Sequence, residues 1–90
     1  MPYIKQDDRK KFEEVLQYFS SERFLPVKIN NPGELNYLFS MLAKIYIEQN
    51  GESYQKYNDV IGALHGASME LYRINVSDYE NIKIKENGPI

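Results

Sequence analysis

The residues best suited to hold a small anion lie on one predicted helix and on the segment after it. Asn58, His65 and Tyr72 recur every seven residues, so they form a line along a helix. Arg73 lies next to this line, and its guanidinium can bind two oxygens of a phosphate or carboxylate at once. The other candidates supply aromatic faces and a further cation: Tyr54, Tyr79 and Lys83. We therefore predict a site between subunits where tyrosine rings stack a base and cations meet phosphate.

The same residues also have ordinary structural interpretations, which stay open at this point. The chain has eight tyrosines but four phenylalanines and no tryptophan, and tyrosine also suits the edge of a small core. Glu70 and Arg73 are three residues apart, which favours a weak ion pair within the helix. His65, as the one histidine of the chain, fits a polar helix position at an interface.

Catalytic chemistry finds little support. The absence of cysteine and the single histidine exclude thiolate or multi-histidine metal sites and thiol nucleophiles within one chain. No glycine-rich phosphate loop, nucleophile elbow or dinucleotide fingerprint occurs. Asp59 and Glu70 are three helical turns apart, unlike the paired carboxylates that hold magnesium in helical nucleotide pyrophosphohydrolases. We predict a non-enzymatic protein without metal or cofactor. A pyrophosphohydrolase-like enzyme ranks third, after a ligand-binding protein and a protein-interaction adaptor.

Composition narrows the class of protein further. Ninety residues with 42% apolar and 27% charged side chains are typical of a single globular domain, here residues 1–90. A net charge of −2 disfavours general binding to nucleic acid. No stretch approaches the ~20 apolar residues of a membrane span, and nothing favours an oxidising compartment. We therefore expect a cytoplasmic protein that does not bind membranes.

Apolar spacing predicts an all-α fold with three principal helices. The first runs from Asp7 to about Arg23, the second over 31–50 and the third from Ser53 to about Asn75. Asp7 or Asp8 supplies either a cap or favourable charge in the first turn. The tail after Asn75 fits a short helix or irregular arm, while its alternating Ile-Lys-Ile-Lys also allows a strand.

Local start and stop patterns mark the second and third helices. Asn31, followed by Pro32 and by Glu34 three residues after the cap, is typical of a helix start. Asn50-Gly51 suits a helix end, and Ser53 can cap the next helix. We expect helices two and three to form an antiparallel hairpin, with the first helix packed across it.

Two features predict a homo-oligomer. The second helix is apolar around too much of its circumference for one neighbour to cover. On the third helix, Gly62 and Gly66 are one turn apart beside the polar line, which indicates close approach by another backbone or a ligand. Seven residues of that helix are expected to face the core: Tyr57, Val60, Ile61, Leu64, Ala67, Leu71 and Ile74.

Across nearly its whole length the chain resembles a family of small proteins from bacteria and their phages that is classed as a domain of unknown function. The segments that carry the resemblance are MPYIKQDDR at 1–9, NPGELNYL at 31–38, YNDVIGAL at 57–64, ELYR at 70–73 and YENIKIKENG at 79–88. The resemblance implies a small accessory protein of the phage type, which acts in the host cytosol if a phage encodes it. Such proteins include helical oligomers that block host defence by sequestering cyclic nucleotides or ADP-ribose derivatives. A helical adaptor or inhibitor that docks on a host protein is the alternative.

Overall fold

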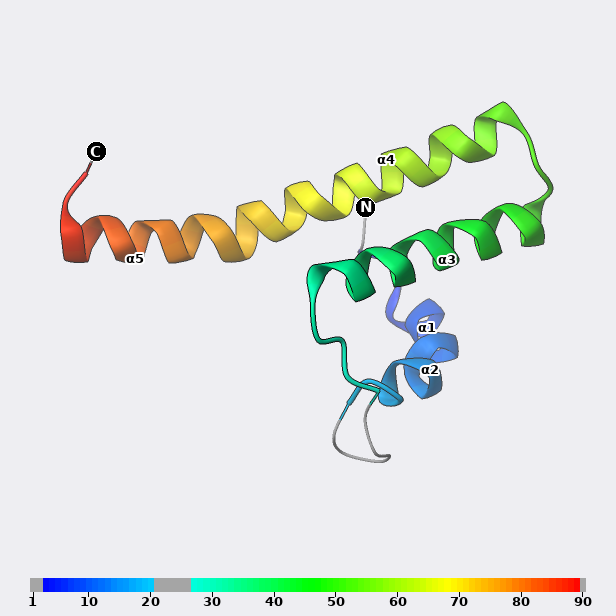
Figure 1. The fold of residues 1–90 in the computed structure, drawn as a ribbon, viewed down its shortest axis with the longest axis horizontal. Helices are drawn as coiled ribbons and strands as arrows, with labels where there is room; N and C mark the ends of the chain where they lie inside the picture. Colours follow the sequence, from blue (N-terminus) through cyan, green and yellow to red (C-terminus); the bar gives the residue numbers. More distant parts are fainter. Residues whose placement is uncertain (1–2, 21–26, 90) are drawn as a thin grey trace. The chain divides into compact units, whose positions relative to one another are not determined.

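A computed structural model describes residues 3–20 and 27–89 of the chain, and these residues are all-α, with three helices and no strand (Figure 1). Tyr3–Glu52 forms one compact unit, and the described residues from Ser53 onward form the other. The predicted fold class is therefore confirmed. The predicted packing of the helices as a bundle remains a prediction.

The first helix is shorter and less regular than its apolar spacing predicts. It consists of α1 (Gln6–Arg9), a 3₁₀ turn η1 (Lys10–Phe12) and α2 (Glu13–Gln17). Asp7 and Asp8 lie in the first turn as favourable charge, while Lys5 occupies the cap position. The expected continuation to Arg23 fails at residues 18–20, where the backbone forms turns and a bend, and residues 21–23 lie outside the described part.

The end of α2 shows why the helix stops there. The amides of Tyr18, Phe19 and Ser20 donate to carbonyls three residues earlier, at 3.1 to 3.2 Å. This tighter pattern satisfies the last carbonyls but does not extend over many residues. The Val27 amide then donates to the Tyr18 carbonyl at 2.7 Å, so the chain has turned back by that point.

Helix α3 (Pro32–Asn50) begins where the capping pattern predicts. The Asn31 side chain accepts the Glu34 amide hydrogen at 2.9 Å, with Pro32 in the first turn. Glu34 reaches back to Asn30, whose backbone amide donates to the carboxylate at 3.0 Å. The two reciprocal bonds satisfy donors at the start of the helix, although the second one falls one residue earlier than in the usual capping box.

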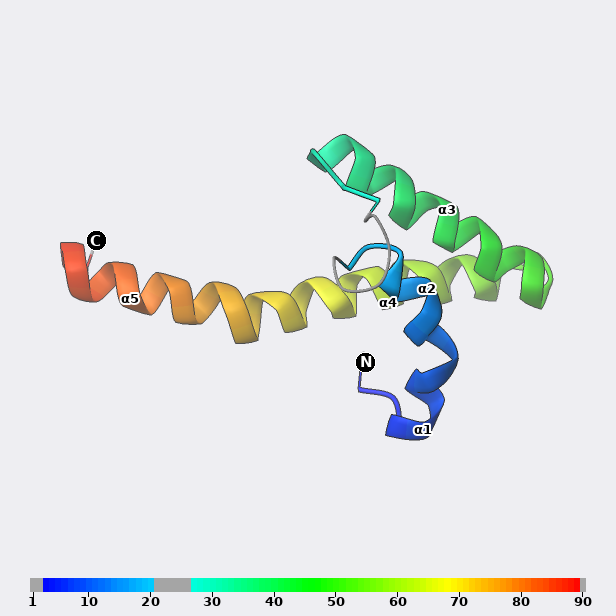
Figure 2. The same ribbon diagram turned by 90° about the horizontal axis from the view of Figure 1, so that it is seen from below.

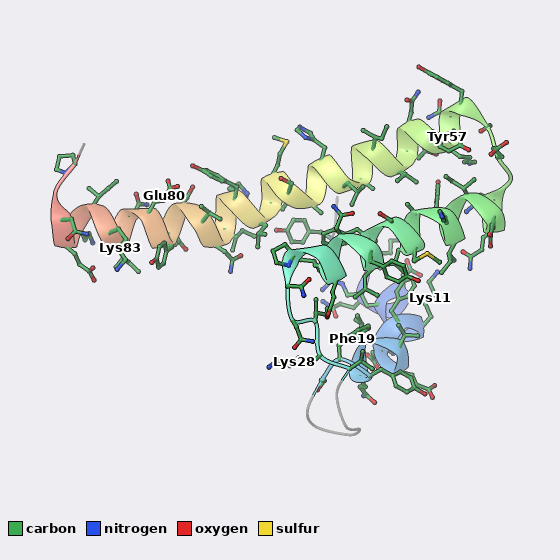
Figure 3. The ribbon with its side chains drawn as sticks, in the orientation of Figure 1. Lys11, Phe19, Lys28, Tyr57, Glu80 and Lys83 are labelled. Atoms are coloured by element: carbon green, nitrogen blue, oxygen red, sulfur yellow. The ribbon has the colours of Figure 1, made fainter. Side chains whose placement is uncertain are left out.

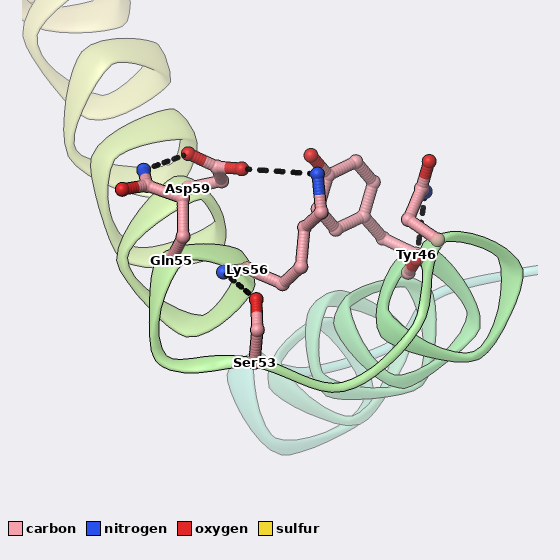
Figure 4. Close-up of polar contacts among 6 residues, drawn as sticks. Tyr46, Ser53, Gln55, Lys56 and Asp59 are labelled. Carbon is pink, nitrogen blue, oxygen red and sulfur yellow. Dashed lines mark hydrogen bonds and ion pairs between the residues drawn. The ribbon is translucent and has the colours of Figure 1, made fainter.

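The end of α3 and the start of the next helix also follow the local patterns. Gly51 has a φ of +87°, a backbone conformation that residues with a Cβ atom rarely adopt. The Asn50 side-chain amide donates to the Tyr46 carbonyl at 2.8 Å, which satisfies one of the last carbonyls of α3 (Figure 4). Ser53 accepts the Lys56 amide hydrogen at 3.2 Å and so caps α4.

The third helix is longer than predicted. It comprises α4 (Tyr54–Leu71), a π-helical turn (Tyr72–Val76) and α5 (Ser77–Asn87), and Gly88 ends it at a φ of +83°. The helical backbone is unbroken from Tyr54 to Asn87 (Figures 1 and 2), and we call this element the long helix. The tail therefore forms a helix, as favoured, but it continues the third helix instead of forming a separate arm.

No side chain within residues 3–20 and 27–89 is buried. Of the residues expected on the core side of the third helix, Val60 is half-exposed and the others, such as Tyr57, Leu64 and Ile74, are exposed. Large apolar side chains normally reach a folded interior, because their burial is the main favourable term in folding. None of the helices in the described ranges has the length and apolarity needed to cross a membrane.

The helical glycine Gly62 gives a first prediction. A Cβ built at this position would have no neighbour within 4 Å, and the residue lies inside α4. Gly62→Ala should therefore raise the free energy of unfolding by about 1 kcal/mol, because alanine loses less backbone entropy in a helix. Urea unfolding at a fixed protein concentration measures this. A loss of stability would instead show that another backbone approaches Gly62.

Candidate functional site

All seven predicted ligand-binding residues lie on the long helix, but one chain does not gather them into one site. Tyr54 begins α4, Asn58 and His65 follow within it, Tyr72 and Arg73 lie in the π-turn, and Tyr79 and Lys83 lie in α5. At about 1.5 Å per residue, Tyr54 and Lys83 are about 40 Å apart along the helix. Figure 3 shows Tyr57 near one end of the long helix, and Glu80 and Lys83 near the other. A small ligand therefore reaches only part of this set in one chain.

The π-turn extends the predicted polar line to a residue that sequence reasoning missed. The Tyr72 hydroxyl lies 3.2 and 3.3 Å from the two carboxylate oxygens of Glu80, eight residues later. In a regular α-helix residues seven apart share a face, and the π-turn adds one residue to that interval. Asn58, His65, Tyr72 and Glu80 thus form one continuous line along the long helix.

Glu80 changes the chemistry of Tyr72. The hydrogen bond to the Glu80 carboxylate, followed by the repulsion that its negative charge exerts on tyrosinate, raises the pKa of Tyr72 above 10.0. Only protonated tyrosine can donate this bond, so it is present below that pKa and is lost as the pH rises through it. The Glu80 carboxylate therefore places a negative charge beside Tyr72 at the end of the line, and this charge repels an anionic ligand.

We expect Glu80→Gln to lower the pKa of Tyr72 toward 10.0, because the amide carries no negative charge. NMR titration of the tyrosine ring signals measures this, with Tyr72→Phe assigning the resonance. Tyr54, which lies on α4 at the other end of the long helix, serves as the internal control, and its ring should give the same chemical shifts at neutral pH in both proteins. An unchanged Tyr72 titration in Glu80→Gln would show that the bond does not form in solution.

Arg73 forms the ion pair with Glu70 that the three-residue spacing favours. Its Nη2 lies 3.0 Å and its Nε 3.3 Å from one carboxylate oxygen of Glu70, three residues earlier. The Arg73 side chain is largely exposed, so this pair contributes only a few tenths of a kcal/mol. An incoming phosphate would have to compete with the Glu70 carboxylate for the guanidinium.

The structure brings two of the predicted residues, Tyr79 and Lys83, together as an aromatic and cationic pair. The Lys83 Nζ lies 5.5 Å from the centre of the Tyr79 ring and 3.2 Å from a Glu86 oxygen. An ammonium within about 6 Å of a tyrosine face is attracted to the ring. This pair lies one turn apart in the middle of α5.

An apolar stripe runs along the long helix beside the polar line. Its intervals alternate between three and four residues up to Ile74, as in a coiled-coil heptad. The next interval, from Ile74 to Tyr79, is five, and the π-turn takes up the extra residue. The apolar stripe consists of Tyr57, Val60, Leu64, Ala67, Leu71, Ile74, Tyr79 and Ile82. The five-residue interval was the sequence pattern that could have revealed the π-turn.

The apolar stripe is accessible along its length. Of its large members, Val60 is half-exposed and the others are exposed, from 43% at Ile74 to 61% at Tyr79. A contiguous apolar surface of this kind is typical of a protein–protein interface, in which the apolar face of a helix contacts the partner. In the described residues, no three His, Asp or Glu side chains gather in a way that would hold a metal ion. The stripe is therefore the most developed surface feature of the long helix.

Comparison with known proteins gives a family but no activity. No curated protein and no solved structure matches the chain significantly. One family model, described as a domain of unknown function and designated DUF6899, matches residues 1–90. The resemblance carried by segments from the first residue to Gly88 is thereby confirmed at the level of the family. The chain belongs to the DUF6899 family over its whole length.

Proposed function

We propose that this chain is a non-enzymatic helical protein-interaction module that works as a homo-oligomer, with the apolar stripe as its association surface. The observation that carries the proposal is the eight-position stripe, which keeps its heptad phase across the π-turn while its large members stay accessible. The described part of the chain has no buried side chain, whereas apolar burial normally offsets the entropy of folding. Association would supply that burial.

The solution mass tests this proposal. Size-exclusion chromatography with light scattering, from low to high micromolar concentration, should give a mass at least twice the 10.6 kDa of one chain. Helicity followed by circular dichroism should rise with the same concentration dependence, because folding and association are linked. A mass of 10.6 kDa at every concentration, together with a stable helical signal, would overturn the proposal.

A ligand-binding function is the second candidate, and the Tyr79–Lys83 pair favours it. The pair offers an aromatic face beside a cation, the combination that meets a base and its phosphate. In this candidate the oligomer sequesters a small anionic ligand, such as a cyclic nucleotide or an ADP-ribose derivative. A site between copies would combine this pair with the same residues of the second copy.

Isothermal titration calorimetry against cyclic dinucleotides and ADP-ribose derivatives tests the second candidate. Any of these compounds that binds the protein should bind the Lys83→Gln variant with much lower affinity, because the substitution removes the cation beside Tyr79. Lys44→Gln, a matched change in α3, should leave the affinity unchanged. No heat with any member would remove this candidate. Product formation from a nucleotide with magnesium would instead favour the pyrophosphohydrolase alternative.

A further inference from the structure

We infer that neighbouring copies of this chain associate through the apolar stripe as a parallel, in-register coiled coil of their long helices. The inference rests on the proposed function, and adds to it the partner segment, its direction and its register. Four observations lead to it: the length of the long helix, the position of the π-turn, the charges beside the stripe and the contacts of Lys83.

The length of the long helix identifies a second copy as the partner that fits. The long helix has 34 residues, or about 50 Å, whereas α3 has 19 residues, or about 28 Å. The stripe from Tyr57 to Ile82 extends over about 38 Å, so a 28 Å helix leaves about a quarter of it uncovered. The long helix of a second copy has the required length and carries the same eight apolar positions.

The π-turn favours parallel over antiparallel pairing. In a parallel, in-register pair the inserted residue occurs at the same height in both helices, so the two stripes stay matched above and below it. In a fully overlapping antiparallel pair, each π-turn would lie opposite regular α-helix in α4. The two seams would then be out of phase at two places.

The charges beside the stripe point to the same direction. Full antiparallel overlap would place Lys56 beside Lys85 of the second copy, and the two copies of Glu70 beside each other. Parallel pairing instead places Asp78 beside Lys83 of the second copy, twice by symmetry. The flanking charges therefore favour the same parallel direction as the π-turn does.

The contacts of Lys83 suit it to this role. Its ammonium lies over Tyr79, a stripe member, and pairs with Glu86 on the same helix. An ammonium has three donors, so Lys83 can keep Glu86 and also reach Asp78 of the second copy. The side chain is therefore already held at the edge of the stripe where the partner helix would arrive.

Cysteine cross-linking tests direction and register on the full chain, which has no cysteine of its own. In a parallel, in-register pair, Tyr57→Cys alone and Ile82→Cys alone should each form disulfide-linked dimers under mild oxidation. Full antiparallel overlap would link neither variant alone and only a mixture of the two. Met69→Cys, away from the stripe, is the control and should stay unlinked.

The outcomes separate this inference from the proposed function. Cross-linking only in the mixture, or in Ile82→Cys alone, with an oligomeric mass would overturn the parallel register and leave the proposed function standing. A monomeric mass would overturn both. If a cysteine variant fails to fold, charge reversal decides: Asp78→Lys and Lys83→Glu should each weaken association several-fold, and the double variant should restore it. Equal weakening in the double variant would contradict the Asp78–Lys83 pairing.

Discussion

Leu71→Asp is expected to dissociate the oligomer into single chains. Leu71 lies in the middle of the apolar stripe, at the last residue of α4. Burying a leucine contributes about 2 kcal/mol, and a pair of copies loses this twice while also facing two unpaired charges. We therefore expect association to weaken by about a thousandfold or more, with a parallel loss of helicity. Light scattering and circular dichroism at the same concentrations measure both effects.

Met69→Asp is the matched control for this change. Met69 is 58% exposed and Leu71 is 59% exposed, so in one chain the two side chains are equally accessible. They lie two residues apart on the same helix, but Met69 points away from the stripe. Met69→Asp should leave the mass of the assembly unchanged. Equal dissociation by both variants would show that the stripe is not the association surface.

Deletion of Asn75 is expected to remove the π-turn and leave association intact. The π-turn accommodates one extra residue between Ile74 and Tyr79. Without Asn75, a regular α-helix would place Tyr79 and Ile82 on the stripe, and Tyr72 and Glu80 would lie at the ordinary seven-residue spacing. We expect unchanged mass, equal or greater helicity, and a Tyr72 pKa that stays raised.

Deletion of Ser68 is the control for that experiment. This deletion falls inside regular α4, where no extra residue is present to be removed. It turns Leu71 and Ile74 about 100° away from the preceding part of the stripe. Association should then weaken by orders of magnitude, as in Leu71→Asp. Similar effects of the two deletions would show that the π-turn does not set the phase of the stripe.

Local capping chemistry made the starts of two helices predictable. Asn31 and Ser53 each accept an amide hydrogen three residues later, so neighbours in sequence suffice to place α3 and α4. The same holds for the Glu70–Arg73 pair, whose partners are one helical turn apart. The predicted end of the first helix was wrong, because the apolar spacing continues past Gln17 whereas the backbone tightens into turns there.

The candidate site was only partly predictable. Asn58, His65 and Tyr72 were identified as a line from their seven-residue spacing, but Glu80 was missed because its spacing of eight does not fit a regular helix. Ser77 added to the difficulty, since a serine near a change in spacing is also typical of a new helix start. The sequence analysis therefore ended the third helix at about Asn75 and treated the tail as a short helix, an irregular arm or a strand, whereas the helix continues to Asn87.

The sequence by itself determined what depends on near neighbours: the all-α class, the caps, the glycine at the end of α3 and the apolar positions of α4. Only the tertiary structure decided that the backbone passes through a π-turn and continues to Asn87. The physical reason is that the hydrogen-bond pattern of the backbone, and not residue type, sets the rotation between Ile74 and Tyr79. That rotation turns two short apolar runs into one stripe.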